Sequence, residues 1–212
     1  MPRAETTPGA TEVARRLRAA GDPLPEAQVE SLTRFLELLN RWNRVYNLTG
    51  IRDADELVDR HLVESLALAP LLRGDRIADV GTGAGLPGMP LAIAEPSRSF
   101  TLIESRAKRV RFLRQAIVEL GLSNAEVAHG RAEHLRFERP FATVLARAVA
   151  PPAELLAIVR GLTAPGSILL LLTSAHLAEQ FAGLAPDFVP RAVELARSAP
   201  KLKSSIVMLE RT

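Results

Sequence analysis

The sequence predicts an α/β protein: a doubly wound, mostly parallel sheet with helices on both faces, preceded by an N-terminal helical extension. After residue 75, short apolar strands alternate with helical stretches, which is typical of right-handed crossovers in a parallel sheet. Before that point only helical periodicity occurs. Near residue 210 two extended segments follow one another without a helix, which permits an antiparallel pair at a sheet edge. We therefore divide the chain into a helical extension at 1–73 and an α/β domain at 74–212.

The extension begins with a frayed or partly helical stretch, residues 1–24, which is interrupted by Pro-Gly and Gly-Asp-Pro breaks. Pro25 suits the first turn of a long amphipathic helix, because its missing N–H has no partner there anyway. Asn47-Leu48-Thr49-Gly50 ends this helix in a loop, and a second helical region covers about 54–72. The apolar stripe of the long helix consists of Val29, Leu32, Phe35, Leu36, Leu39, Trp42 and Val45.

The α/β domain is predicted element by element from its apolar runs and the breaks between them. The predicted strands lie near 76–80, 99–103, 124–128, 141–146 and 167–172. The predicted helices lie near 87–95, 106–120, 151–161 and 175–183. The extended pair at the end covers 190–197 and 205–210.

Composition excludes several classes of protein. The 212 residues contain no cysteine, so disulfides and thiol chemistry are excluded. No apolar stretch approaches the ~18 residues of a membrane span, and the first residues lack the apolar core of a secretion signal. The four histidines form no tight metal pattern. We therefore expect a cytoplasmic protein with no membrane and no metal partner. Its cations are mostly arginine, which suits phosphate and base recognition but equally reflects genome composition.

A glycine loop follows the first predicted strand. In Asp79-Val80-Gly81-Thr82-Gly83-Ala84-Gly85-Leu86, three glycines stand at alternate positions, which lets a ligand approach the backbone and its N–H groups. No Gly-Lys-Ser/Thr follows, so this is not a phosphate-binding P-loop. Leu86 stands where the dinucleotide fingerprint has its last glycine. The loop is thus a nucleotide loop of another kind, or else a tight turn without a ligand.

An acid ends the second predicted strand. Glu104 lies 23 residues after Gly81, the place and spacing at which a carboxylate accepts both hydroxyl hydrogens of a ribose. The alternative is a solvated glutamate that caps the next helix. The glycine loop upstream favours ribose binding.

Two further strand ends carry candidate ligand contacts. After the third strand, Ala132-Glu133 offers a small residue beside a carboxylate, which suits an adenine ring read by backbone N–H groups. The same stretch reads equally well as an ordinary loop. Arg147 ends the fourth strand among small apolar residues, and is either a clamp on loop carbonyls or a ligand contact. No Ser/His/Asp set and no paired carboxylates compete for catalysis. A ribose acid without a phosphate motif implies an adenosyl ligand without polyphosphate, a description that S-adenosylmethionine meets.

The stretch Asp79–Ile93 resembles the cofactor loop of the bacterial 16S ribosomal RNA guanine-N7 methyltransferases, also called glucose-inhibited division protein B. The resemblance covers roughly residues 25 to 210. It extends to Asn40-Arg41-Trp42-Asn43, Asn47-Leu48-Thr49, Arg60-His61 with Ser65-Leu66, Lys108–Leu113, Ala132-Glu133 and Arg147-Ala148.

The resemblance implies a class I S-adenosylmethionine-dependent methyltransferase: a Rossmann-like seven-stranded sheet whose last strand is antiparallel, in a methyltransferase domain at 74–212. It implies methyl transfer to N7 of a guanosine in 16S ribosomal RNA or the small ribosomal subunit, by a protein we expect to be a monomer. Arg147 is the expected catalytic contact. The expected cofactor contacts are Gly81, Gly83, Gly85, Leu86, Glu104, Ala132, Glu133 and Arg147.

The chain departs from the family pattern in three places: Ala142 and Glu64 each stand where aspartate is usual, and the pair Thr173-Ser174 stands where Lys-Gly is common. Ala142 and Thr173 motivate an alternative, a methyltransferase-fold RNA-binding assembly factor with weakened catalysis. A small-molecule methyltransferase is a third reading, for which the arginine-rich extension would be surplus. The expected RNA-facing rim is formed by arginines 41, 44, 52, 60, 106, 109 and 147.

Overall fold

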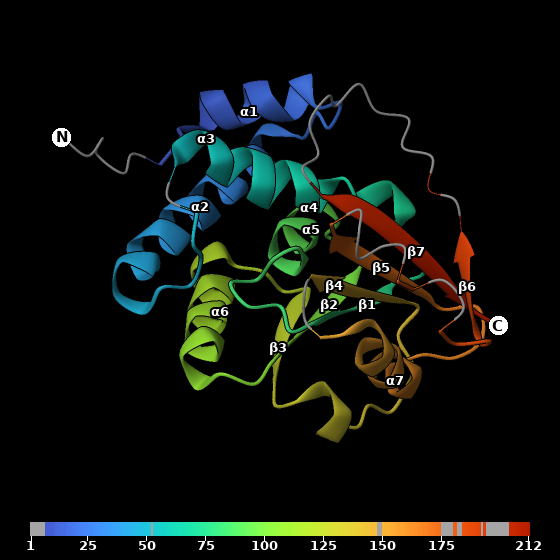
Figure 1. Cartoon of the computed structure of the whole chain (residues 1–212). Helices are drawn as coiled ribbons and strands as arrows, with labels where there is room; N and C mark the ends of the chain where they lie inside the picture. Colours follow the sequence, from blue (N-terminus) through green and yellow to red (C-terminus); the bar gives the residue numbers. More distant parts are fainter. Residues whose placement is uncertain are drawn as a thin grey trace.

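A single sheet forms the centre of the computed structural model (Figure 1). The structure describes residues 7–51, 53–147, 150–174, 180–181, 184–191, 193 and 204–212. Within them the strands are β1 (Arg76–Val80), β2 (Ser99–Glu104), β3 (Ala125–His129), β4 (Thr143–Arg147), β5 (Ile168–Thr173), β6 (Phe188–Arg191) and β7 (Ser205–Arg211). They lie in the order β3-β2-β1-β4-β5-β7-β6.

The strand directions confirm the predicted fold class. β1 to β5 pair in parallel, whereas β7 pairs antiparallel with both β5 and β6. The chain reverses its winding between β1 and β4, the topological switch point at which ligands bind beyond the carboxyl ends of the strands. β6 begins two residues before the predicted segment at 190–197, and residues 194–197 lie outside the described part. Of the predicted helix at 175–183, only residues 180–181 are described, and they form a turn.

Helices cover both faces of the sheet, as predicted (Figure 1). The extension holds α1 (Ala10–Ala19), α2 (Glu26–Tyr46), α3 (Ala54–Leu57), the π-helix η1 (Val58–Val63), α4 (Glu64–Leu66) and the 3₁₀ helix η2 (Ala69–Leu71). The remainder holds α5 (Gly88–Ala94), α6 (Ala107–Leu120), the 3₁₀ helix η3 (Ala132–His134) and α7 (Pro152–Leu162). The predicted helical region at 54–72 is therefore divided. Its central π-helix is a rare geometry that is frequent at functional sites.

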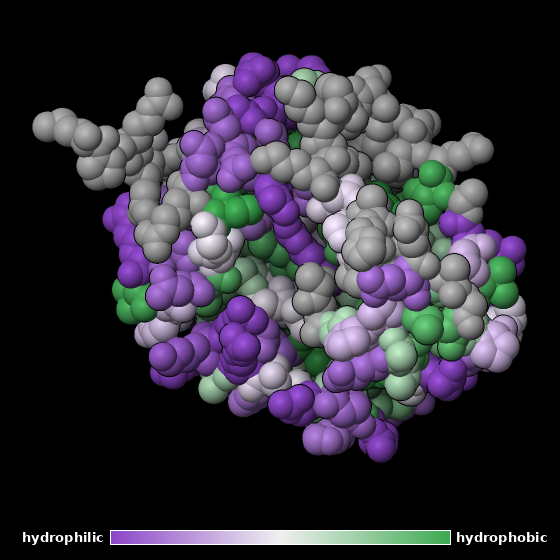
Figure 2. All heavy atoms as spheres, in the orientation of Figure 1, coloured by the Kyte–Doolittle hydropathy of each residue, from purple (hydrophilic) through white to green (hydrophobic). Residues whose placement is uncertain are grey.

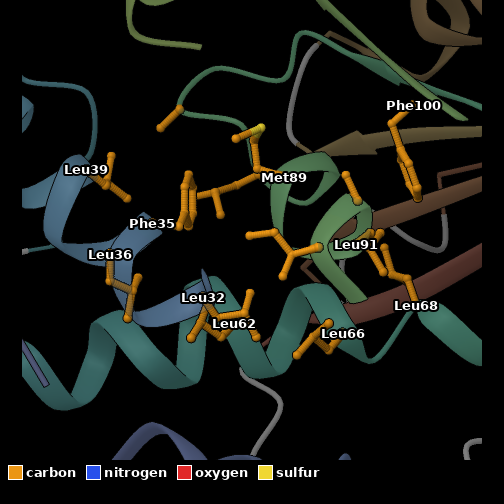
Figure 3. Packing of buried hydrophobic residues seen from close by; sticks show 14 of the residues in the cluster. Leu32, Phe35, Leu36, Leu39, Leu62, Leu66, Leu68, Met89, Leu91 and Phe100 are labelled. Carbon is orange, nitrogen blue, oxygen red and sulfur yellow. The ribbon is translucent and has the colours of Figure 1, made fainter. Parts of the chain in front are cut away.

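Two hydrophobic clusters lie on the two faces of the sheet. The larger joins α1, α2 and the η1–α4 segment to α5 and α6; Figure 3 shows Phe35 of α2 and Leu62 of η1 near Met89 and Leu91 of α5. The smaller packs α7 against the other face. The extension at 1–73 thus shares its core with the sheet, and the boundary at residue 74 stays a prediction.

The end of α2 fixes the loop that follows it. Trp42 lies 5.7 Å from Phe112 of α6 between ring centroids, so α2 is docked on α6. Asn47 adopts the left-handed conformation that ends many helices. The side-chain Oδ1 of Asn43 then accepts the backbone N–H of Thr49 at 2.9 Å, which directs the chain toward the sheet. No helix among the described residues is long and apolar enough to cross a membrane.

Candidate active site

A cavity of about 480 Å³ lies beyond the carboxyl ends of β1, β2 and β4. The glycine loop after β1, Glu104 at the end of β2 and Arg147 at the end of β4 form one side. The extension forms the opposite side, with Leu48, Thr49, Ile51 and His61. In the orientation of Figure 1 the surface is hollowed near its middle, below the N-terminal helices (Figure 2). The structure therefore brings three of the predicted site elements to one place, and adds a wall that the sequence did not reveal.

The glycine loop is shaped by backbone conformations that favour glycine. Gly81, Gly83 and Gly85 have φ values of 63°, 62° and 84°. The loop is held at both ends, because the N–H of Thr82 donates to the carbonyl of Ile103 at 3.1 Å and that of Gly85 to Thr82 at 2.9 Å. A Cβ on Gly85 would lie 2.4 Å from Cγ of Met89. The glycines therefore serve both the turn and the close packing of α5.

Substitution of Gly85 by alanine is expected to lower the free energy of unfolding by about 2–5 kcal/mol, since left-handed strain adds to a steric clash. Gly121 is the matched control: its φ is +64° but an added Cβ meets nothing within 4 Å. Gly121→Ala should lower the free energy of unfolding by only about 1–2 kcal/mol. Urea unfolding of both variants measures the difference. Equal losses would show that crowding at Met89 plays no part.

Asp79 anchors the loop from beneath. Its Oδ2 accepts the hydroxyl of Thr82 at 2.6 Å and the backbone N–H of Gly88 at 2.8 Å. Oδ1 is buried without a partner among the described residues. Burial raises the pKa of Asp79 from 3.8 to about 7, against the lowering effect of these two hydrogen bonds.

This raised pKa predicts a stability that depends on pH. The folded carboxyl group binds protons more tightly than the unfolded one, so its contribution to stability is fully present below pH 3.8 and is lost as pH rises to about 7. Asp79→Asn removes this titration while keeping an oxygen for Thr82 and Gly88. We expect the free energy of unfolding of the wild type, relative to that of the variant, to fall between about pH 4 and pH 7 and to level off above that. Urea titrations at several pH values test this, and a constant difference would contradict it.

Glu104 lies at the centre of the candidate cofactor site. Only 4 % exposed, it accepts the N–H of Gly83 at 3.1 Å and that of Arg106 at 2.8 Å. The guanidinium of Arg109 lies 3.4 Å from the same carboxylate. A carboxylate has about four acceptor positions. The two backbone N–H groups fill two of them and hold the side chain in place, and a ribose diol would need the other two, one of which Arg109 approaches in this structure.

A second cavity of about 280 Å³ adjoins the first and shares Gly81, Glu104, Ser105 and Arg106 with it. Its far end is lined by Ala132 and Glu133, which begin η3. The first N–H groups of a helix have no partner within it, so they are available to a ligand. Glu104 thus lies where two adjoining cavities meet, one of them lined by the glycine loop and the other by the start of η3.

Arg147 contacts a carbonyl of the π-helix η1 rather than one of a loop, and its side chain also lines the cavity. Its guanidinium donates to the carbonyl of Arg60 at 3.2 Å and lies 3.5 Å from the carboxylate of Glu64. That carboxylate, on a residue 1 % exposed, also accepts the hydroxyl of Ser204 at 2.9 Å. Burial lowers the pKa of Arg147 from its ordinary value, and Glu64 opposes this.

His61 and Thr49 form a polar pair on the wall from the extension. The ring Nε2 of His61 lies 3.1 Å from Oγ1 of Thr49. Burial, and then the charge of Arg147, lower the pKa of His61 to about 4, so the ring is neutral at pH 7. From the sequence, His61 falls in the predicted helical region at 54–72 and Thr49 in the loop before it. The one signal for either was the family resemblance, which extends to Asn47-Leu48-Thr49 and, separately, to Arg60-His61.

The arginines predicted to face the RNA divide into those that line the cavity and those that lie away from it. Arg106 and Arg109 line it, whereas Arg41 lies by Glu119 on α6, and Arg52 is outside the described residues. His129 and His134 are exposed, and no group of metal-ligating residues occurs in the part of the chain that the structure describes.

The departures from the family pattern lie in different places. Ala142 precedes β4, at the sheet edge opposite the cavity, where its Cβ faces Gly74. Its identity therefore gives no support to weakened catalysis. Thr173 is buried at the end of β5, where it pairs with Ser205 of β7. Glu64 is the departure that lies within the site, as the partner of Arg147.

Comparisons with known proteins agree with this geometry. The family model described as rRNA small subunit methyltransferase G matches residues 28–197. A ribosomal RNA small subunit methyltransferase G of Halorhodospira halophila is 48% identical over 167 residues, 79% of each chain. One of Yersinia pseudotuberculosis is 43% identical over 178 residues, 84% of this chain and 86% of the relative.

Solved structures show the fold. A candidate O-methyltransferase of Klebsiella pneumoniae has a TM-score of 0.60 at 16% identity and covers 95% of this chain and 96% of its own. A mutant of MtNAS in complex with S-adenosylmethionine has a TM-score of 0.55 at 15% identity, covering 95% of this chain and 77% of its own.

Proposed function

The chain belongs to the ribosomal RNA small subunit methyltransferase G family, and from this we propose that it transfers a methyl group from S-adenosylmethionine to N7 of a guanosine in 16S ribosomal RNA. It is an S-adenosylmethionine-dependent methyltransferase of class I fold. We further propose that it works in the cytoplasm as a monomer, on the RNA or the small ribosomal subunit. The observation that carries the proposal is the position of Glu104 between two cavities, one ending at Ala132-Glu133 and the other at Arg147.

The proposed cofactor contacts follow from this arrangement. Glu104 holds the ribose hydroxyls, and the start of η3 holds the adenine through Ala132 and Glu133. Leu86, Gly81 and Gly83, which line the cavity, border the amino-acid end, and Gly85, which does not line it, shapes the loop. Arg147, at the end of β4, lies where that end meets the acceptor base.

The chemistry asks little of side chains as acids or bases. S-adenosylmethionine supplies, when bound, a methyl group on a sulfonium sulfur, which is already a strong electrophile. Guanine N7 carries an unprotonated lone pair, so no general base is required. The protein's part is to hold the base in line and to exclude water, and well-oriented approach alone contributes roughly 7–11 kcal/mol. A neutral His61 in the cavity adds no charge against a purine that becomes cationic.

The base must leave its RNA context to reach this cavity, because a stacked base in a helix is not accessible to the cofactor. Arg106 and Arg109 at the cavity wall are proposed to meet the RNA backbone there. The extension supplies the other wall, which accounts for its presence in an enzyme that acts on RNA.

The test is transfer of labelled methyl from S-adenosylmethionine to 16S ribosomal RNA, and to small subunits, from cells that lack this protein. We expect incorporation at one guanosine, which mass spectrometry of nuclease fragments maps. Ribosomal RNA from cells that contain the protein is the control and should accept none. Cofactor binding without incorporation into any RNA would refute the proposal, and sedimentation of the purified protein tests the monomer.

A further inference from the structure

The wall of the cavity contributed by the extension carries groups that the cofactor contacts do not use. Leu48 and Ile51 are its apolar part, and Thr49 and His61 its polar part. Three buried polar atoms of the η1–α4 segment have no partner among the described residues: Nε of Arg60, Nδ1 of His61 and Oε1 of Glu64. Of these three residues His61 lines the cavity. An unpartnered polar atom in a buried side chain calls for an explanation, and a ligand that completes the bonding is one.

The hydrogen bonds of Thr49 can be counted. Its Oγ1 accepts the backbone N–H of Ile51 at 3.2 Å and lies 3.1 Å from Nε2 of His61. If Nε2 carries the ring proton, both lone pairs of the hydroxyl are used, and its hydrogen has to point to a third group. The other tautomer would bury an N–H at Nδ1, which has no hydrogen-bond partner among the described residues, and an orphaned donor is rarer than an unused lone pair.

We propose that Thr49 is the residue that recognises the acceptor base as guanine: its hydroxyl, oriented by His61, donates a hydrogen bond to O6 of the purine that is to be methylated. This rests on the proposed function and names the subsite for the base. O6 lies on the same edge of guanine as N7, so one donor there both aligns N7 and identifies the base.

The same contact excludes adenine. At the corresponding position adenine presents an amino group, which is a donor, and a donor facing a donor leaves both without a partner. A site that hydrogen-bonds one group in this way discriminates far better than apolar shape alone. Leu48 and Ile51 supply apolar surface for the flat ring beside this contact.

The experiment uses the full chain and three versions of the substrate RNA, with guanosine, inosine or 2-aminopurine at the mapped position. Inosine keeps O6 and lacks the 2-amino group, whereas 2-aminopurine keeps N7 and the amino group and lacks O6. We expect the wild type to methylate inosine RNA nearly as well as guanosine RNA. Its kcat/KM for 2-aminopurine RNA should be about 10- to 100-fold lower.

Thr49→Val removes the hydroxyl and keeps the shape of the side chain. It should lower kcat/KM for guanosine RNA about 10- to 100-fold and leave kcat/KM for 2-aminopurine RNA unchanged. The ratio of kcat/KM for guanosine RNA to that for 2-aminopurine RNA therefore falls. Thr49→Ser, the matched control, should restore the ratio. A structural defect would instead lower kcat/KM for both RNAs equally. The affinity of the variant for S-adenosylmethionine, measured by calorimetry, should stay within twofold of the wild-type affinity.

His61 is a positioning residue in this proposal and has its own test. His61→Leu should reduce the substrate ratio as Thr49→Val does, whereas His61→Gln, which keeps an N–H near Nε2, should preserve it. A wild type that methylates no guanosine would refute the proposed function. If the wild type methylates guanosine RNA and the Thr49→Val variant keeps the wild-type ratio of kcat/KM between the two RNAs, this inference alone is overturned. A full ratio in His61→Leu would overturn the role of His61.

Discussion

Substitution of Glu104 by glutamine is expected to weaken the binding of S-adenosylmethionine at least about 100-fold, the largest effect of any single change in the cofactor site. Each hydrogen bond to a charged acceptor contributes about 1.5–3 kcal/mol, and a ribose diol would make two of them to this carboxylate. Glutamine keeps the shape of the side chain and can still accept the N–H of Gly83, but it replaces one acceptor by a donor. Isothermal titration of the purified variant measures the loss.

The matched control is Glu126→Gln, the same chemical change one strand away. Glu126 accepts the hydroxyl of Thr101 at 2.9 Å on β3 and lines neither cavity of the site. Its substitution should leave cofactor affinity unchanged. Circular dichroism and thermal unfolding establish that both variants are folded. If the Glu104 variant binds the cofactor within twofold of wild type, Glu104 is not the ribose acid.

Substitution of Arg147 by alanine is expected to reduce methyl transfer about 100-fold, because the acceptor base and the amino-acid end of the cofactor lose a shared positioning group. It should also destabilise the fold by about 3 kcal/mol, the lower end of the range for breaking a buried ion pair. The cause is Glu64, whose carboxylate is 1 % exposed in a pair with Arg147, which is 21% exposed. Without the guanidinium, the hydroxyl of Ser204 is the one hydrogen-bond partner that this buried carboxylate keeps among the described residues.

A double variant separates the two losses. In Arg147→Ala/Glu64→Gln the stranded charge is gone, and the amide oxygen still accepts from Ser204. We expect urea unfolding to show most of the stability restored, while single-turnover methylation of 16S ribosomal RNA stays low. Recovery of activity together with stability would mean that Arg147 acts only as a clamp on the carbonyl of Arg60.

The parts of the site that the sequence predicted depend on local chemistry. Positive φ values at Gly81, Gly83 and Gly85 confirm that the loop glycines have a conformational reason. Glu104 and Arg147 were identifiable because parallel strands bring their carboxyl ends to one edge, so a residue at a strand end is placed by topology alone. The proposed adenine contacts at Ala132-Glu133 needed the family resemblance, because nothing local distinguishes these residues from a loop.

The wall formed by the extension could not be predicted in the same way. Thr49 and His61 are 12 residues apart and meet only because α2 is docked on α6 and the chain then turns back at Asn47. Such contacts depend on how two amphipathic helices pack, which periodicity does not specify. The wider turn of η1 was equally hidden, since the apolar spacing of 54–72 reads as one helix.

Ala142 is a residue to which the sequence assigned a role that its position in the structure does not support. As a departure from a family pattern it appeared to bear on catalysis, yet it precedes β4 at the edge of the sheet away from the cavity. The end of a strand at which a residue falls decides whether it can reach a ligand, and only the register of β4 with β1 settles that.

The position of β7 has a consequence for the order of folding. β6 precedes β7 along the chain, but its neighbour in the sheet is β7, which lies between β5 and β6. During synthesis β6 therefore emerges before the strand that pairs with it, and β5 keeps an open edge until β7 arrives. Ser204, the residue before β7, also joins the buried carboxylate of Glu64 across 140 positions. Contacts of such separation form slowly, so completion of the sheet and of the site around Arg147 is expected to be one late event.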